Sequence, residues 1–293
     1  MRAVHRRLAD ECRFGHRTRS RAGSRRSGCG ESDDGDRRNA WGDIVRSLAG
    51  ATATTVSVLI LVAGCTPQPA DQITVFAAAS LKPTFTELGS QFEKDHPGTK
   101  VTFHFAGSSD LVTQLTLGAP ADVFAAADTR TMTEAVEAGL IEDDPVTFAS
   151  NTLTIVTTPA NTRKIGSFAD LAEPGTQLVV CAPQVPCGSA TEKLEQLTGV
   201  TLSPVSEESA VTDVLGKVTS GQADAGLVYL TDATTAGSKV TAIPFVESSS
   251  AVNRYPIAVL AESTHSSAAR RFVDLVTGPR GQAVLAAAGF GSP

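Results

Sequence analysis

The chain has 293 residues and carries 25 Lys and Arg against 31 Asp and Glu, a formal net charge of −6. Twelve of the basic residues are arginines within residues 1–46, so that from Cys65 onward 13 basic residues face 24 acidic ones, a net charge of −11. This acidic balance argues against a protein that binds nucleic acid or anionic membrane surfaces. The length after residue 64 suits one large domain or two of about 100 residues, each with its own core.

A short apolar segment, residues 47–63 (SLAGATATTVSVLILVA), precedes Gly64-Cys65. A run of this length that ends in small residues is typical of a secretory signal peptide and its cleavage site. It is too short and too weakly apolar to indicate a permanent membrane span, although an uncleaved anchor is the alternative. A cysteine directly after the cut resembles a bacterial lipobox, which predicts that residues 1–64 are removed and that Cys65 becomes the lipidated first residue.

The arginine-rich stretch before this segment is longer than the basic region of a signal peptide needs to be. We therefore expect translation to start near Val45, which would make residues 1–44 a wrongly assigned start. After the cut, residues 65–71 (CTPQPAD) form a short polar tether with two prolines. A lipid on Cys65 would hold the folded part at the extracytoplasmic face of the cell membrane.

Three β–α units follow the tether. The apolar run ITVF and the alternating run VTFHF are typical of strands, and a serine or aspartate that precedes an apolar helical pattern suits an N-cap. The expected strands are 73–76, 101–105 and 121–126, and the expected helices start after Ser80, Ser108 and Asp128. Strands and helices that alternate at this spacing predict a mostly parallel sheet with helices on both faces.

The second half of the chain repeats this alternation. Gly and Pro pairs such as Pro174-Gly175 and Gly278-Pro279 mark the breaks between its elements. The expected strands are 151–158, 177–181, 222–230, 240–245 and 255–260, and the expected helices are 167–171, 190–197, 210–220, 267–277 and 280–288. Both halves therefore predict an α/β fold.

The serines at the first two turns point to an anion site. A strand that ends at a helix N-terminus with a hydroxyl group leaves several N–H donors aimed at one place, which suits an anion. In open α/β sheets ligands bind beyond the carboxyl ends of the strands, where Ser80 and Ser108 both lie. The plainer alternative is an ordinary β–α turn with a capping serine.

Cys181 and Cys187 are the only cysteines after Cys65. In an exported protein, two cysteines at this spacing predict a disulfide that closes a small loop. A metal site would need further Cys or His residues nearby, and a thioredoxin-like dithiol would need a two-residue gap.

Six short motifs follow one another along the chain: VFAAASL (75–81), FAGSSDL (105–111), GAPADVFAAAD (118–128), VPCGSAT (185–191), SAVTDVL (209–215) and GQADAGLVY (221–229). Taken in this order, they resemble the molybdate-binding lipoproteins of bacterial ABC importers. The likeness covers nearly all of residues 73–290 and implies the two-lobed type II periplasmic-binding-protein fold, with a ligand cleft between the lobes. The cysteine pair resembles an actinobacterial version, since other members carry alanine where this chain has Cys187.

The resemblance implies a set of oxyanion-binding residues. Ser80 and Ser108 would each offer a hydroxyl and a backbone N–H, Cys187 and Val211 a backbone N–H each, and Tyr229 its phenol. That set makes up to about seven hydrogen bonds. None of the five is Lys or Arg, so neutral dipoles would hold the dianion. The metal enters only as molybdate or tungstate held by these residues, and no cofactor or catalytic residue is expected.

The resemblance also implies how the chain is organised and what it meets. Lobe I would comprise 72–150 plus 253–293 and lobe II 151–252, with the anion selecting a closed form. The partners would be an ABC permease and its ATPase, and the membrane through the lipid on Cys65. We expect a monomer that binds no nucleic acid.

Other functions remain as alternatives. The chain could bind sulfate or phosphate, and Asp110, next to the second serine turn, could accept the proton of hydrogen phosphate. It could also feed a sensor in place of a permease. An enzyme is disfavoured because Gly107-Ser108-Ser109 is not a GxSxG nucleophile motif. The histidines after Cys65, which are His96 at a turn, His104 on the polar side of a strand and His265 in a loop, are typical of solvated side chains rather than of a catalytic base.

Overall fold

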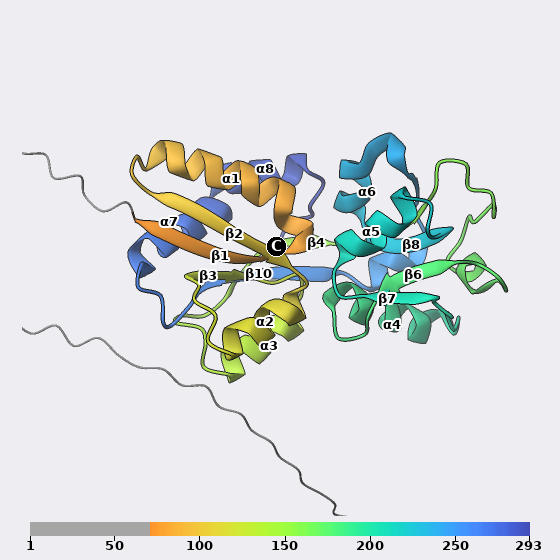
Figure 1. The fold of residues 1–293 in the computed structure, drawn as a ribbon, viewed down its shortest axis with the longest axis horizontal. Helices are drawn as coiled ribbons and strands as arrows, with labels where there is room; N and C mark the ends of the chain where they lie inside the picture. The colour runs from red at the N-terminus through yellow and green to blue at the C-terminus, as the bar shows by residue number, and fades with distance from the viewer. Residues whose placement is uncertain (1–70) are drawn as a thin grey trace, which may run out of the picture. The chain divides into compact units, whose positions relative to one another are not determined.

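The structure, a computed structural model, describes residues 71–293. The leader, the lipidation site Cys65 and most of the tether at 65–71 lie outside the described residues. The described residues contain two five-stranded sheets, each flanked by helices (Figure 1). None of their helices combines the length and the apolar character that a membrane crossing requires. The predicted α/β fold with two sheets is confirmed.

The first sheet, with its helices, is called lobe I. Its strand order is β2-β1-β3-β10-β4, in which β1, β2 and β3 run parallel and β10 runs antiparallel to both β3 and β4. The strands are β1 (Gln72–Ala78), β2 (Lys100–Ala106), β3 (Val123–Ala125), β4 (Val146–Asn151) and β10 (Asn253–Val259). The helices are α1 (Lys82–Asp95), α2 (Ser108–Thr116), α3 (Thr129–Glu137), α7 (Ser266–Thr277) and α8 (Pro279–Ala287).

The alternation of side chains along β1 gives lobe I two cores. Ile73 and Val75 join the large core that includes residues of α1 and α7, whereas Phe76 joins a smaller core with residues of α2 and α3. Successive strand residues point to opposite faces, so one strand supports helices on both sides. Figure 1 shows α1, α7 and α8 on one face of the sheet and α2 and α3 on the other.

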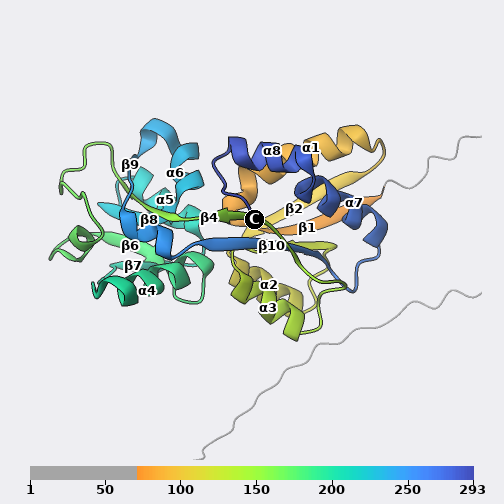
Figure 2. The same ribbon diagram turned by 180° about the vertical axis from the view of Figure 1, so that it is seen from behind.

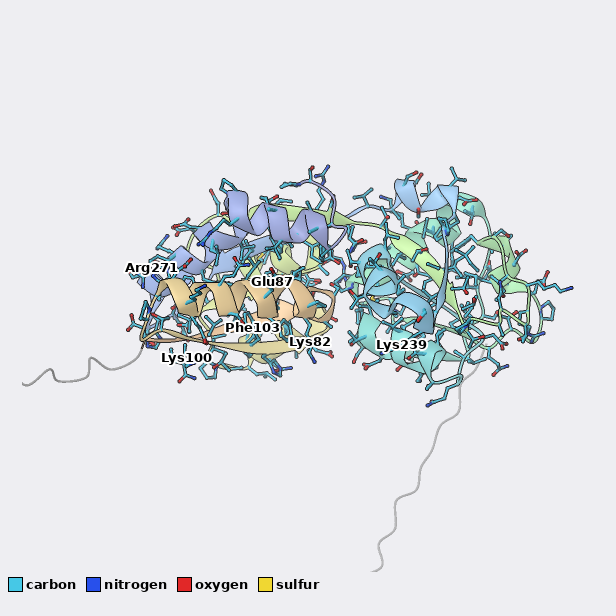
Figure 3. The ribbon with its side chains drawn as sticks, turned by 90° about the horizontal axis from the view of Figure 1, so that it is seen from above. Lys82, Glu87, Lys100, Phe103, Lys239 and Arg271 are labelled. Atoms are coloured by element: carbon cyan, nitrogen blue, oxygen red, sulfur yellow. A yellow bond between two sulfur atoms is a disulfide. The ribbon has the colours of Figure 1, made fainter. Side chains whose placement is uncertain are left out.

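The outer face of lobe I illustrates how the α1 layer is built. Gly89 of α1 leaves space for the ring of Phe103 on β2, because a Cβ at residue 89 would lie 2.5 Å from the Phe103 ring. The exposed side chains of Lys82, Glu87 and Arg271 cover the solvent side of α1 and α7 (Figure 3). Apolar residues therefore face the sheet and charged residues face water.

The second sheet, with its helices, is called lobe II. Its strand order is β7-β6-β8-β5-β9, in which β6, β7 and β8 run parallel and β5 runs antiparallel to β8 and β9. The strands are β5 (Leu153–Thr157), β6 (Leu178–Cys181), β7 (Ser206–Glu208), β8 (Ala225–Tyr229) and β9 (Thr241–Ile243). The helices are α4 (Pro186–Thr198), α5 (Val211–Thr219) and α6 (Leu230–Ala236), and short 3₁₀ turns are η1 (Ala79–Leu81), η2 (Ala169–Ala172), η3 (Gly237–Lys239) and η4 (Val246–Ser250).

The chain passes between the lobes twice. β4 ends at Asn151 in the first sheet and β5 begins at Leu153 in the second. The return follows η4 into β10 at Asn253, which pairs directly with Asn151. Figure 2 shows β4 and β10 side by side where the two sheets approach each other. The two crossings therefore form one short two-stranded connection.

Each sheet is mixed but mostly parallel, as predicted: four of its five strands run in one direction, and the strand that enters from the other lobe, β10 or β5, runs antiparallel to its neighbours. Several expected elements differ from the structure. The single strand expected at 151–158 is the end of β4 followed by β5, split at the crossing. Helix α4 begins four residues earlier than expected, at Pro186, where a missing N–H costs little. Helix α6 was not predicted, because its sequence, LTDATTA, has little apolar periodicity.

Candidate functional site

All five residues of the expected anion site line one cavity between the lobes. The cavity is small. Its lining comprises Ala78, Ala79, Ser80, Ala106, Gly107, Ser108 and Ala127 from lobe I, and Val185, Pro186, Cys187, Val211 and Tyr229 from lobe II. These residues follow the carboxyl ends of the parallel strands of both sheets, as expected for open α/β sheets. No lining residue carries a charged side chain.

Ser108 is the first residue of α2, directly after its N-cap Gly107. Its side-chain oxygen accepts a hydrogen bond from the backbone N–H of Ala127 at 3.0 Å, and the residue is buried. Because that bond occupies an acceptor position, the hydroxyl hydrogen is left to donate elsewhere. The backbone N–H of Ser108 has no partner within the helix, since the first N–H groups of a helix are unpaired. Ser108 therefore has two donors available to the cavity.

Ser80 does not cap a helix as the sequence suggested. It lies inside η1, and α1 begins only at Lys82, with no side-chain cap. Its hydroxyl instead lies 3.1 Å from the phenol oxygen of Tyr255, a fully buried residue of β10. Because η1 precedes α1, Ser80 is not the residue that directly precedes the helix. When Tyr255 donates to Ser80, the serine hydrogen is free for a ligand.

Tyr229 ends β8 with its side chain buried in the cavity wall. Its phenol oxygen is buried and has no hydrogen-bond partner among the described residues. Burial, together with the nearby Tyr255 and Asp128, raises the pKa of Tyr229 well above its usual value, so the phenol stays protonated. An unpaired buried hydroxyl is costly, and an anion in the cavity would accept its hydrogen. The Tyr229 ring packs edge-on against Tyr255.

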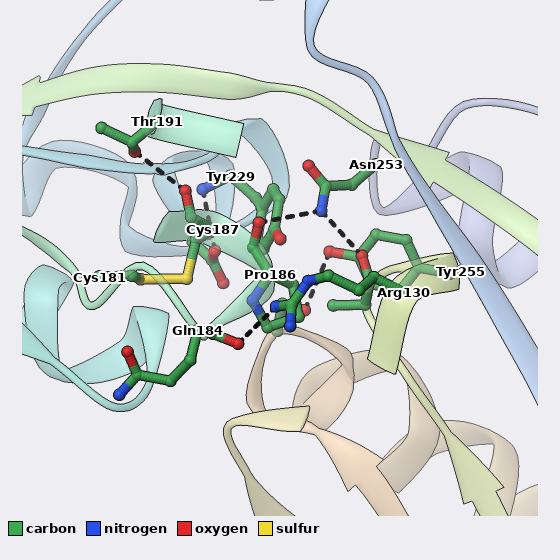
Figure 4. Close-up of a disulfide and its surroundings, with 12 residues drawn as sticks. Arg130, Cys181, Gln184, Pro186, Cys187, Thr191, Tyr229, Asn253 and Tyr255 are labelled. Atoms are coloured by element: carbon green, nitrogen blue, oxygen red, sulfur yellow. Dashed lines mark hydrogen bonds between the residues drawn. A yellow bond between two sulfur atoms is a disulfide. The ribbon is translucent and has the colours of Figure 1, made fainter. Parts of the chain in front are cut away.

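Cys187 and Val211 contribute through their backbones. Cys187 follows Pro186 in the first turn of α4, and Val211 is the first residue of α5, so both N–H groups lack a partner within their helices. Cys187 is joined to Cys181 by a disulfide that spans 5.6 Å between Cα atoms (Figure 4). Gly188 permits this tight loop, because a Cβ at residue 188 would lie 1.9 Å from the Ala182 carbonyl oxygen.

Asp232 lies directly behind the site and was not singled out from the sequence. Its buried carboxylate accepts the backbone N–H of Tyr229 at 3.2 Å. Burial raises the pKa of Asp232 to about 7, although the bond from Tyr229 acts in the opposite direction. It does not line the cavity. A lone acidic residue followed by Ala and Thr gave no sequence signal for this position.

Two side chains of lobe I bond to the disulfide loop of lobe II. The amide of Asn253 donates to the carbonyl of Ala127 at 3.0 Å and to that of Pro186 at 3.3 Å (Figure 4). Arg130 donates to the carbonyl of Gln184 at 2.5 Å. These contacts hold the two lobes together around the cavity, which is therefore in a closed arrangement.

The chemistry of the cavity is that of a hydrogen-bond donor shell. Its side chains supply two serine hydroxyls and one phenol, and its helix N-termini supply backbone N–H groups. Within residues 71–293 no group of three or more His, Cys, Asp or Glu is arranged to hold a metal ion. Donors without an acceptor or a counter-charge suit a small, fully deprotonated anion.

Known proteins share both the sequence and the fold. The profile of the family described as bacterial extracellular solute-binding protein matches residues 73–291. The molybdate-binding protein ModA of Mycobacterium tuberculosis (strain ATCC 25618 / H37Rv) is 54% identical over 226 residues, which cover 77% of this chain and 87% of the relative.

Two solved structures share the fold. The periplasmic molybdate-binding protein of Azotobacter vinelandii matches with a TM-score of 0.66 and 22% identity, over 75% of this chain and 99% of its own. The sulfate-binding protein SubI of Mycobacterium tuberculosis H37Rv matches with a TM-score of 0.62 and 23% identity, over 75% of this chain and 86% of its own. The chain belongs to the bacterial extracellular solute-binding proteins and, within them, to the family of the ModA molybdate-binding proteins.

Proposed function

We propose that this protein binds molybdate outside the cytoplasm and delivers it to an ABC importer. The observation that carries the proposal is the closed, uncharged cavity in which the phenol of Tyr229 is buried without a partner. A tetrahedral dianion would accept this hydrogen together with those of the serines and helix N-termini. The 54% identity to a protein named as molybdate-binding supports molybdate as the anion.

The proposed ligand shell consists of the five residues expected from the sequence. Ser80 and Ser108 would each give a hydroxyl and an N–H, Cys187 and Val211 an N–H, and Tyr229 its phenol. Hydrogen bonds to a charged acceptor contribute about 1.5–3 kcal/mol each. Several of them in a closed cavity would offset the costs of desolvation and ordering and leave about 8 kcal/mol, a micromolar or tighter affinity.

An all-donor shell also selects among anions. Hydrogen phosphate carries a proton that requires an acceptor, whereas molybdate, tungstate and sulfate are fully deprotonated at neutral pH. Asp110, which could have accepted that proton, is exposed and does not line the cavity. We therefore propose that the protein binds tungstate as well as molybdate and discriminates against phosphate.

Sulfate is the second candidate, because the sulfate-binding SubI has the same fold. Sulfate and molybdate carry equal charge and differ chiefly in size, so the dimensions of the closed cavity would separate them. The cavity is far smaller than sites for drug-sized ligands, as expected of a site for a single small ion.

The cellular setting follows from the family and the leader. We propose that residues 1–64 are removed, that a lipid on Cys65 anchors the monomer at the outer face of the membrane, and that lobe I (72–150 plus 253–293) and lobe II (151–252) close around the anion. A permease with its ATPase would recognise the closed form. The protein would act as a receptor and not as an enzyme. The alternative is that the protein delivers its signal to a sensor. A pull-down of membrane partners distinguishes a permease from a sensor.

The test is isothermal titration of the soluble Cys65→Ala protein with molybdate, tungstate, sulfate and phosphate. We expect micromolar or tighter binding of molybdate and tungstate, and binding of phosphate at least a hundredfold weaker. Absence of heat with molybdate alongside tight sulfate or phosphate binding would overturn the proposal.

A further inference from the structure

We propose that a backbone contact between Gly107 of lobe I and Ser209 of lobe II is the stop that sets how far the cleft closes. Gly107 joins β2 to α2, and Ser209 joins β7 to α5. A Cβ built on Gly107 would lie 1.9 Å from the Ser209 carbonyl oxygen. Because a carbon–carbon bond is about 1.5 Å long, the Gly107 Cα itself lies within about 3.4 Å of that oxygen. Main chain thus meets main chain across the cleft.

Glycine is required at residue 107 because the Ser209 carbonyl comes so close, and not because of the backbone dihedral angles of residue 107. Gly107 has φ −60° and ψ 141°, a conformation that every L-residue adopts without strain. An alanine here would therefore fit lobe I by itself. It would collide only with lobe II, and only when the lobes are closed.

The contact adjoins the proposed donors on both sides. Gly107 immediately precedes Ser108, and Ser209 lies two residues before Val211, whose N–H faces the same cavity. Real Cβ atoms essentially never approach another heavy atom within 3.0 Å, so a methyl group at residue 107 would separate the two turns by about 1 Å. Hydrogen bonds of this kind span about 2.7–3.2 Å, so an anion could no longer reach both turns.

A main-chain stop differs from the other contacts between the lobes. The bonds made by Arg130 and Asn253 come from side chains, which can adjust by rotation. The carbonyl of Ser209 and the Cα of Gly107 cannot. The contact therefore fixes the separation of the Ser108 and Val211 donors, and with it the size of anion that the closed cleft accepts. This inference rests on the proposed function, because it assigns the closing geometry of that same site.

The test is Gly107→Ala, compared with wild type by molybdate titration, by thermal unfolding without anion and by small-angle scattering. We expect molybdate affinity to fall at least tenfold and the molybdate-induced compaction to shrink, while the anion-free melting temperature stays unchanged. A merely structural role would lower the melting temperature as well.

Gly216→Ala serves as the control. It makes the same change on α5, where a Cβ meets nothing within 4 Å. This variant should bind molybdate as wild type does. Wild-type affinity in Gly107→Ala would overturn the inference, whereas a wild-type protein that binds no molybdate would overturn the proposed function instead.

A second measurement does not depend on how the variant folds. In the wild-type protein, the Gly107 Hα resonances report directly on the approach of the Ser209 oxygen. We expect molybdate to shift them strongly and to leave those of Gly216 in place. Unshifted Gly107 resonances in a protein saturated with molybdate would also refute the stop.

Discussion

Tyr229 combines two properties that usually exclude each other, complete burial and an unpaired hydroxyl. In the closed cavity this hydroxyl is a cost when no anion is bound, and a bound anion would accept its hydrogen. Ser109 also has a buried hydroxyl oxygen without a partner among the described residues, but it does not line the cavity. Comparing variants of these two residues therefore distinguishes the cost of burying an unpaired hydroxyl from the contribution of a hydroxyl to binding.

Tyr229→Phe should act in opposite directions on folding and on binding. Removing the unpaired hydroxyl should leave the anion-free unfolding free energy unchanged or raise it slightly. Molybdate affinity should fall tenfold or more, since a bond to a charged acceptor of about 1.5–3 kcal/mol is lost. Urea denaturation and isothermal titration measure the two effects. Ser109→Ala, the control, should keep wild-type affinity, and unaltered binding by Tyr229→Phe would contradict the assignment of the phenol.

Asp232 should make stability depend on pH. Burial raises its pKa from 3.8 to about 7, so between these values the folded state holds a proton that the unfolded state has released. The free energy of unfolding that this group contributes therefore falls as the pH rises from about 4 to 7, by up to about 4 kcal/mol in total. Above pH 7 it stays constant. Asp232→Asn should flatten that slope in urea titrations. Identical slopes for the variant and wild type between pH 5 and 7 would refute the raised pKa of Asp232.

At the scale of elements, the same device recurs in both lobes: a parallel strand ends, and a helix begins at the cavity. In lobe II the start of α4 is also tied to the end of β6 by the disulfide between Cys181 and Cys187. The proposed ligand shell uses only the backbone N–H of Cys187 and not its side chain. The disulfide would then stabilise the loop without contacting the ligand.

Replacing both cysteines by alanine should therefore separate stability from affinity. Opening a loop of this size should cost about 2 kcal/mol of unfolding free energy. Molybdate affinity should change less than threefold, because the N–H of residue 187 remains in the first turn of α4. Denaturation and titration of the double variant check both values, with reduced wild type as the comparison. A tenfold loss of affinity would show that the disulfide positions the ligand shell.

At the scale of the whole molecule, the two lobes are joined by the crossings at 151–153 and 253 and by the side chain of Asn253. Its buried amide bonds to a carbonyl of each lobe, Ala127 and Pro186. The bond to Ala127 lies within lobe I, whereas the bond to Pro186 crosses to lobe II and is made only when the lobes are closed. The amide therefore contributes to closure through its bond to Pro186.

Asn253→Ala should weaken molybdate binding about tenfold, mainly by faster dissociation, because closure is less favourable. Stopped-flow measurement of molybdate release tests this. Arg254→Ala is a matched control, since the neighbouring Arg254 is exposed. Equal dissociation rates in Asn253→Ala and Arg254→Ala would show that the amide does not act on closure.

The sequence by itself determined the local part of this protein: the β–α units, the serine turns after parallel strands and the residue types of an uncharged donor site. Such features depend on side-chain periodicity and helix starts within about ten residues. They were sufficient to bring Ser80 and Ser108 into consideration, whereas Tyr229 entered only through the resemblance to the molybdate-binding family. They failed where the local pattern was weak, as at α6, or where two strands of different sheets adjoin, as at β4 and β5.

Only the tertiary structure decided how those turns meet. The partner of Ser80 is Tyr255, 175 residues away, and Asn253 reaches Ala127 across 126 residues. The need for glycine at 107 is visible only beside Ser209 of the other lobe. Contacts at such separations depend on how two independently formed sheets pack, which no spacing in the chain records. The residues of the proposed site could therefore be named from the sequence and its resemblance to a family, and the contacts that close the cavity around them could not.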